Sequence, residues 1–529
     1  MQYDYIIVGA GSAGCVLANR LSEDPGVRVL LLEAGMSDWH PFIHMPAGVA
    51  ELLKGKLFNW YFDTAPEKQL NNRRLYWPRG KGLGGSSSMN GMIYIRGHRQ
   101  DYDEWARDHG CSGWSYDEVL PYFRKSESFA GGDAGFHGTD GPLRLTQDAS
   151  GHLLFGVFKE AARQAGYRET TDFNGAQQEG YGSYQLTIAD GARQSTAVAF
   201  LDPAKARPNL TVLTRAQVRS IDIADGRATG VTFRKGFATH TAQAAREVLL
   251  CAGAVHSPQL LMLSGIGDGD QLRRFGIAVR QHSPQVGRNL RDHLDVMVQQ
   301  NCTQPVTLFE QTKFHRMILT LIQYYRTRQG LGATNALEAG AFVKTDPSLA
   351  IPDVQLHFIP AFMLDHAREV GPGHGYMLHA CQLRPRSKGT IALASADPFA
   401  APVIQPNYLS DPFDVEVLVK AVKIARRIFA QPAFDPYRGP EEVPGPAVQT
   451  DAQIVDCIRQ KAETIYHPVG SCRMGADAAS VVDPDCRVRG IAGLRVVDAS
   501  VMPTLIGGNT NAPTIMIAEK IADRIRGRG

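Results

Sequence analysis

The N-terminal glycine motif constrains the fold more than any other part of the chain. An apolar run of strand length, residues 4–8, leads into the pattern G-x-G-x-x-G formed by Gly9, Gly11 and Gly14. A helical pattern follows, and then a second apolar run that ends at Glu33. In such a unit the glycines make the tight turn, admit a pyrophosphate and let the helix pack on the strand, while a carboxylate about twenty residues later binds a ribose hydroxyl. The helix N-terminus offers free N–H groups to the phosphates. The unit predicts a dinucleotide-binding domain and leaves NAD and FAD open.

The bulk composition narrows the class of protein. At 529 residues the chain exceeds one ordinary core, so we expect two or more domains. The formal net charge is only +3, and the basic residues 524–528 are typical of a solvated helix end, so no nucleic-acid partner is expected. The eight cysteines form no C-x-x-C pair, which favours reduced thiols in a cytoplasmic protein. The first strand follows Met1-Gln2 directly, and no apolar run approaches the ~18 residues of a spanning helix. We expect a soluble cytoplasmic protein, at most peripherally bound to the inner face of the membrane.

Residues 79–91 form a second segment near the N-terminus that is rich in glycine, a residue typical of loops. Its glycines and serines let the backbone lie close against a flat or anionic ligand. A flexible linker would have polar residues on both sides, whereas this segment runs into the apolar residues 92–95. A packed binding loop is therefore favoured.

The rest of the chain falls into two kinds of pattern. Residues 209–254 read as short strands, and the last strand ends in small residues before a helix that starts near Pro258. From about 296 to 459, apolar alternation and proline-rich turns predict an antiparallel sheet with helices. The last seventy residues return to a strand near 494–500 and a helix opened by residues 507–514. We predict an α/β fold with a discontinuous Rossmann-like domain (1–150, 200–295 and 460–529) and an α+β substrate domain with an antiparallel sheet (151–199 and 296–459).

One amphipathic stretch lies inside the second domain. Apolar residues between Met317 and Tyr325 share one helical face, beside Lys313, Arg316 and Arg326. An interfacial membrane helix is one interpretation. A helix packed over the pocket is favoured.

Two polar residues near the C-terminus, His467 and Asn511, are candidates for chemistry. Taken alone, any one of the sixteen histidines is more often structural or solvated than catalytic. The chain has no H-E-x-x-H and no clustered His/Cys spacing, so no metal is expected. No G-x-S-x-G elbow follows a strand, so a serine hydrolase has little support.

Four segments together resemble the glucose–methanol–choline (GMC) oxidoreductases, a family of FAD enzymes. They are residues 9–14 with Glu33, residues 80–90, residues 253–258 running to 264–267, and His467-Pro468 with residues 509–514. The second and third segments match the family's two signature patterns, and the resemblance covers essentially the whole chain. It implies the GMC fold and FAD as the cofactor.

The resemblance also implies a reaction. An alcohol loses its O–H proton and a C–H hydride; His467 takes the proton, Asn511 hydrogen-bonds the substrate oxygen, and the hydride passes to flavin N5. Residues 90–93 are implied to lie beside the flavin ring. The full set implied to contact FAD is Gly9, Gly11, Ser12, Gly14, Glu33, Ala34, Arg79, Gly84, Gly85, Ser87, Asn90, Gly91, Met92, Ile93, Val218, Ala252, Gly253, Asp498, Ala499, Pro513 and Thr514.

This chain departs from some relatives at Met89. Certain relatives attach FAD covalently through a histidine at this position of the glycine-rich loop, and a thioether does not form that linkage under ordinary conditions. We therefore predict non-covalent FAD.

The sequence constrains the identity of the substrate less than that of the cofactor or the reaction. The pattern looks closest to bacterial dehydrogenases of primary alcohols, aliphatic or aromatic, that pass electrons to a quinone or similar acceptor. Choline-type or sugar-alcohol dehydrogenases and oxygen-using oxidases share the motifs. Glu338 resembles the carboxylate that meets choline's ammonium in choline-oxidising relatives, but aliphatic-alcohol enzymes carry it too, and a structural acid is equally plausible. A flavoprotein that oxidises no alcohol is the alternative of another class, and the presence of His467 and Asn511 argues against it.

Overall fold

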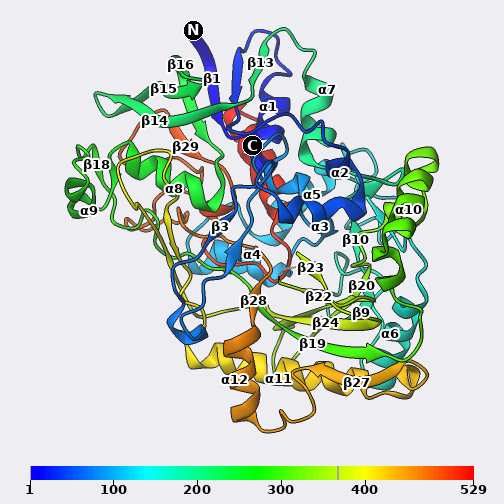
Figure 1. Ribbon diagram of the computed structural model, residues 1–529. Coiled ribbons are helices and arrows are strands. Elements are labelled where there is room, and N and C mark those ends of the chain that lie inside the picture. Colours follow the sequence, from blue (N-terminus) through cyan, green and yellow to red (C-terminus); the bar gives the residue numbers. More distant parts are fainter. Residues whose placement is uncertain (1, 366–367, 529) are drawn as a thin grey trace.

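The computed structural model describes residues 2–365 and 368–528, and its longest strands form two sheets of seven strands each (Figure 1). The first sheet has parallel strands at its centre: β1 pairs in parallel with β2 and β16, and β13 and β29 extend the parallel part. β14 and β15 add an antiparallel edge beside β16. The strand order is β13 (Leu210–Leu213), β2 (Val29–Leu32), β1 (Gln2–Val8), β16 (Ala238–Leu250), β15 (Arg227–Lys235) and β14 (Ala216–Ala224), with β29 (Leu494–Val496) on β16.

The second sheet is antiparallel throughout. Helix α11 (Pro412–Phe429) packs across β24, β19 and β21, below the sheet in the view of Figure 1. The strand order is β27 (Arg438–Val443), β19 (Leu294–Cys302), β24 (Gly375–Gln382), β21 (Val354–Ile359), β20 (Ala339–Val343) and β9 (Gly180–Ser183), with β28 (Glu463–Thr464) on β19.

The two ends of the chain pack together. Helix α1 (Ser12–Leu21) connects β1 to β2, and α13 (Asn511–Ile525) lies against it. The guanidinium of Arg20 forms a bidentate ion pair with Glu519 of α13, at 2.7–3.0 Å. Hydrophobic residues of α13 such as Ile515 and Ile521 are fully buried. The C-terminal helix is therefore part of the first domain's core.

Shorter elements surround the two sheets. The other helices are α2 (Pro41–His44), α3 (Val49–Lys54), α4 (Arg99–Asp108), α5 (Tyr116–Ser126), α6 (Leu153–Gln164), α7 (Asp202–Ala204), α8 (Gly253–Leu263), α9 (Gly269–Arg274), α10 (Phe314–Thr327) and α12 (Asp451–Lys461). The short strands are β3 (Phe62–Asp63), β4 (Tyr76–Trp77), β5 (Ile93–Tyr94), β6 (Glu127–Ser128), β7 (Leu143–Arg144), β8 (Thr146–Gln147), β10 (Gln185–Leu186), β11 (Ile188–Ala189), β12 (Ala192–Arg193), β17 (Ile266–Gly267), β18 (Gln281–His282), β22 (Met363–Leu364), β23 (Glu369–Val370), β25 (Thr390–Ala392) and β26 (Val403–Gln405). In the part of the chain that the structure describes, no helix has the length and apolarity needed to cross a bilayer.

The arrangement of the strands refines the expected domain division at one point. β28, which lies within the range 460–529 expected for the first domain, pairs with β19 of the second sheet. The chain thus runs beside the start of β19 just before it reaches His467. The exact domain boundaries stay a prediction.

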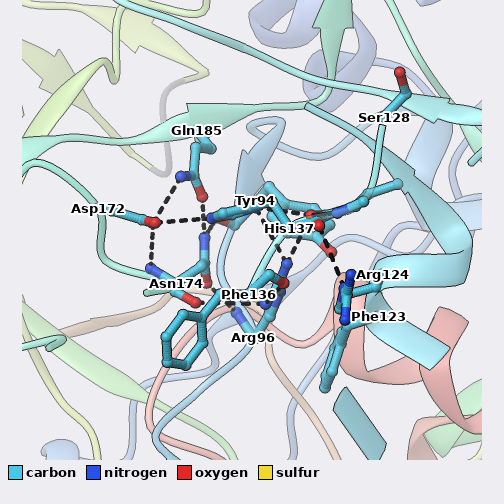
Figure 2. Close-up of polar contacts among 12 residues, drawn as sticks. Tyr94, Arg96, Phe123, Arg124, Ser128, Phe136, His137, Asp172, Asn174 and Gln185 are labelled. Atoms are coloured by element: carbon cyan, nitrogen blue, oxygen red, sulfur yellow. Dashed lines mark hydrogen bonds and ion pairs between the residues drawn. The ribbon is translucent and has the colours of Figure 1, made fainter. Parts of the chain in front are cut away.

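A buried polar network fixes the segment that follows β5 (Figure 2). Arg96 pairs with Glu127 at 2.7 Å, and His137 lies between Glu127 and Asp172, at 2.7 and 2.8 Å. Gln185 donates to Asp172 from β10. Although burial opposes it, the hydrogen bond from His137 lowers the pKa of Asp172 to about 2. The network connects four separate parts of the chain around the end of β5.

Candidate active site

One cavity collects most of the residues that the sequence singles out. Its volume is about 410 Å³, and its wall includes the glycine turn after β1, the loop 78–93, the start of α8 and the segment around His467. Ligand sites typically enclose 300–1,000 Å³. In the described residues, no group of three or more His, Cys, Asp or Glu side chains is arranged to hold a metal.

Most of the predicted site residues line this cavity. They are Gly9, Gly11, Ser12, Glu33, Ala34, Arg79, Gly85, Asn90, Gly91, Met92, Ile93, Val218, Ala252, Gly253, His467, Asp498, Ala499, Asn511 and Thr514. They come from the N-terminal, middle and C-terminal segments of the chain that build the first sheet, and from the loop 78–93. The fold thus brings together residues that are up to 505 positions apart, from Gly9 to Thr514.

Five predicted residues do not line the cavity. A Cβ on Gly14 would lie 1.9 Å from the Gly9 carbonyl oxygen, so Gly14 serves helix packing. Gly84 and Ser87 shape the turn, because the Ser87 hydroxyl donates to the Gly84 carbonyl at 2.6 Å. Pro513 is buried in the first turn of α13. Glu338 is 1% exposed and accepts from the Ser150 amide at 3.0 Å and from the Thr334 hydroxyl, so its carboxylate is held in the protein interior.

The glycine turn has the shape that a dinucleotide needs. A Cβ on Gly9 would lie 2.5 Å from the Cys251 carbonyl oxygen, whereas a Cβ on Gly11 would meet no atom within 4 Å. The turn is therefore closed toward the sheet and open at Gly11 for a ligand. The Glu33 carboxylate accepts hydrogen bonds from the backbone amides of Ala10 and Gly35, at 2.9 and 2.7 Å. Burial raises the pKa of Glu33. Its carboxylate oxygens keep lone pairs for ribose hydroxyls. These residues fit the adenosine and pyrophosphate part of FAD.

The backbone around His467 is tightly held. Tyr466 adopts φ = 66°, a conformation that is uncommon for a residue with a side chain and that often occurs at functional sites. Arg79 donates to the Tyr466 carbonyl at 2.8 Å, and the His467 amide donates to Asp292 at 2.7 Å. Burial raises the pKa of Asp292 to about 6. These contacts fix the direction of the imidazole.

A hydrogen-bond chain sets the tautomer of His467. The Nε2 of His293 lies 3.0 Å from the Leu383 carbonyl, which only accepts, so Nε2 carries the hydrogen. Burial lowers the pKa of His293 to about 3, so its ring is neutral and Nδ1 has the lone pair. His293 Nδ1 lies 3.0 Å from His467 Nδ1, so His467 must donate there. The Nε2 of His467 is consequently unprotonated.

The amide beside this nitrogen belongs to Asn509, whereas the sequence prediction names Asn511, and the catalytic role of Asn511 stays a prediction. Asn509 Nδ2 lies 3.2 Å from His467 Nε2, and its Oδ1 accepts from Gln355 at 3.2 Å, which fixes the orientation of the amide. Asn511 instead accepts from the Ser12 hydroxyl at 2.7 Å. Asn511 begins α13, so its side chain lies toward the glycine turn and Asn509, in the preceding loop, lies toward His467.

The electrostatics favour a neutral imidazole. Burial lowers the pKa of His467 well below its ordinary range, and His293, His357 and Arg79 lower it further. A neutral histidine whose unprotonated Nε2 lies in the cavity wall, beside the Asn509 amide, is able to accept a proton near neutral pH. The arrangement fits general-base chemistry.

The wall on the second-sheet side is largely aliphatic. Met297, Leu337, Ile359 and Ile465 line it. The polar residues there include His357, His379, Glu463, Thr464 and Asn335. No residue of 302–333 lines the cavity among those described, and α10 packs on the loop 330–333.

Sequence reasoning missed Asp292 and His293, which bond His467, and Gln355, which orients Asn509. Asp292 and His293 stand in a connecting segment with no local motif, and Gln355 lies within an ordinary strand. Their sequence separations from His467 are large, and only the pairing of β19, β21 and β24 brings them together. The motif contains Asn509, but it does not show that the Asn509 side chain points toward His467.

Similar sequences and structures cover the whole chain. The sequence profile of the GMC oxidoreductases matches residues 3–295 with its N-terminal part and residues 385–518 with its C-terminal part. The human mitochondrial choline dehydrogenase is 47% identical over 538 residues, which cover 100% of this chain and 90% of the relative. The alcohol dehydrogenase [acceptor] of Pseudomonas putida is 48% identical over 529 residues, covering 99% and 96%.

Two solved structures are similar throughout. Pyridoxine 4-oxidase from Mesorbium loti matches with a TM-score of 0.90 and 32% identity, covering 100% of both chains. A formate oxidase from Aspergillus oryzae, studied for its FAD modification, matches with a TM-score of 0.93 and 27% identity, covering 99% and 98%. The predicted fold class and the predicted FAD cofactor are confirmed. The chain belongs to the GMC oxidoreductase family.

Proposed function

We propose that this protein oxidises a primary alcohol to the aldehyde, with His467 as the base that takes the hydroxyl proton. The observation that supports this best is the unprotonated Nε2 of His467 in the cavity wall, beside the Asn509 amide. Burial keeps the imidazole neutral, as a base must be before the reaction.

The roles of the protein groups follow from their positions. His467 Nε2 receives the hydroxyl proton, and the positive charge that it gains remains beside the His293 lone pair. Asn509 Nδ2 donates to the substrate oxygen and holds it near His467. FAD, when bound, accepts the hydride at N5. Asp292 and Arg79 keep the imidazole in place by fixing the backbone at residues 466–467.

The aliphatic wall favours an alkyl alcohol over choline. Met297, Leu337 and Ile359 offer apolar area to a hydrocarbon chain. Proteins recognise quaternary ammonium groups with aromatic cages. Among the described residues of the cavity wall, only Trp60 and Tyr466 are aromatic (Trp, Tyr or Phe). The buried Glu338 contributes no carboxylate to the wall.

Choline is the second candidate, and one observation favours it. Glu463 lines the cavity next to His379, and a carboxylate there is able to attract a cationic substrate. Several similar proteins are choline dehydrogenases, including the human mitochondrial one.

The two candidates separate in an anaerobic titration. With FAD-loaded protein, we expect hexanol or benzyl alcohol to bleach the flavin absorbance at lower concentration than choline does. A FAD-loaded His467→Ala variant is the control and should bleach slowly with every alcohol. Bleaching by choline alone would establish the second candidate, and no bleaching by any alcohol would refute the proposed reaction. Reoxidation by oxygen or by a quinone analogue then separates an oxidase from a dehydrogenase.

We further propose that FAD is held without a covalent bond. Met89 occupies the loop position used for attachment in certain relatives; it lines the cavity and is 5% exposed. Acid precipitation should release the yellow colour into the supernatant, where its spectrum is measured. Colour that stays in the washed pellet would contradict the proposal.

We also propose that this protein is cytoplasmic and passes its electrons to a quinone. We propose further that it contacts the inner face of the membrane. Five of the ten large hydrophobic side chains that are exposed in the described chain lie on α10, at the right of Figure 1. They are Met317, Ile318, Leu319, Ile322 and Tyr325. Arg316 and Arg326 on the same helix, and Lys313 at its N-cap, would meet anionic headgroups.

We expect the protein to sediment with phosphatidylglycerol vesicles, and the double variant Ile318→Asp/Ile322→Asp to lose most of this binding. Phe237→Asp is the matched control, because Phe237 is fully exposed on a turn of the first sheet. Equal sedimentation of all three proteins would argue against a role for α10.

A further inference from the structure

One buried arginine lacks the partner that such residues normally have. Arg193, at the end of β12, is 1% exposed. Its guanidinium donates to the carbonyls of Asn90, Ser87 and Ile43 at 2.7, 3.3 and 2.8 Å, and to the Asn90 Oδ1 at 2.9 Å. All four acceptors are neutral. Within the described residues, Nη2 has no hydrogen-bond partner and no carboxylate pairs with the guanidinium.

Two other buried arginines show the usual arrangement. Arg96 is 0% exposed and pairs with Glu127, and Arg495 is 5% exposed and pairs with Glu247. Burying a charge without a counter-charge is costly, so proteins rarely retain one without a function. Burial lowers the pKa of Arg193 to about 9, which still leaves it positively charged at neutral pH.

The charge lies directly behind a wall of the cavity. Arg193 holds both the carbonyl and the side chain of Asn90, and Asn90, Gly91 and Met92 face the cavity. Met92 has φ = 62°, and its amide donates to Asn90 Oδ1 at 3.1 Å. Asn335 fixes the same segment from the other side by donating to the Gly91 carbonyl at 2.6 Å. The segment is held rigidly between an arginine and an amide.

We propose that Arg193 is a positioning residue that fixes Asn90–Met92 against FAD and that its unpaired charge makes the flavin easier to reduce. Hydride transfer moves an electron pair and a hydrogen from the alcohol carbon to the flavin, and so adds one negative charge in the cavity. A nearby cation with no competing carboxylate stabilises that charge. The inference rests on FAD binding in this cavity and is independent of which alcohol is oxidised.

The test measures the two-electron midpoint potential of bound FAD against a reference dye, with dithionite as the reductant and no alcohol present. We expect Arg193→Gln to lower the equilibrium constant for reduction at least tenfold, which is about 30 mV. Arg495→Gln is the matched control. It removes a buried arginine away from the cavity and leaves Glu247, which is partly exposed, so the potential should stay at the wild-type value. An unchanged potential in FAD-loaded Arg193→Gln would overturn the proposal.

Arg193→Lys keeps a cation at this position that is lost when the pH is raised, so it tests the charge separately from the loss of the side chain. A buried lysine has a lowered pKa, so it loses its proton at a pH where the arginine keeps its own. The Arg193→Lys potential should match the wild type at about pH 6 and fall below it by about 30 mV at about pH 8, where the arginine is still charged. If the two potentials stay parallel across this range, the charge has no effect and the proposal fails, even where Arg193→Gln does not fold.

Discussion

His467→Ala should lower turnover by about 10²–10⁴, with FAD still bound, because a positioned acid–base group contributes an effect of this size. The variant removes Nε2, the nitrogen that the chain through His293 leaves unprotonated. Steady-state kinetics with the best alcohol and the flavin absorbance of the purified variant measure both quantities. Unchanged turnover would exclude His467 as the base.

The pH profile of the wild-type protein provides an independent check. The base must be neutral, and burial holds the pKa of His467 well below 6.5. Lowering the pH therefore reduces kcat/KM only well below the ordinary histidine value of about 6.5, because the imidazole stays neutral down to that pH. We expect a level profile from that pH up to neutral. An acidic limb centred above pH 6.5 would mean that the alcohol meets a different base.

Asn509→Ala should lower kcat/KM by about 10²–10³, the usual cost of losing one donor to a reacting oxygen. Asn511→Ala should cost less than that in turnover and should weaken FAD binding, because Asn511 contacts Ser12 at the glycine turn. Each variant removes one asparagine side-chain amide, and the two positions lie only two residues apart, so each variant is the control for the other. Kinetics with saturating FAD and a fluorescence titration of FAD separate the effects. The opposite ranking in turnover would restore Asn511 to the role that the sequence suggested.

The sequence was sufficient for the parts of the fold that depend on local patterns. Gly9 and Gly14 predicted the strand–turn–helix unit, and each is needed where the backbone approaches closer than a Cβ allows. The alternation around Val354–Phe358 predicted a strand of the antiparallel sheet, and β21 occupies that position. These predictions succeed because neighbours in the sequence determine them.

The direction of individual side chains could not be predicted in this way. Asn509 and Asn511 stand on either side of Thr510, and the start of α13 decides which of them faces His467. Glu338 precedes β20, and the contact with Ser150 that removes it from the cavity wall joins residues 188 positions apart. The counterpart of His467, His293, is 174 positions away. Such contacts follow from the pairing of distant strands, which no short motif encodes.

The ion pair between Arg20 and Glu519 has a consequence for biosynthesis. It joins the first helix of the chain to the last, 499 positions later. Until α13 has left the ribosome it is unable to dock on α1, and the wall formed by Asn509 and Thr514 is missing. Flavin capture must therefore follow the docking of α13, and a nascent chain stalled before residue 509 should emerge without bound flavin.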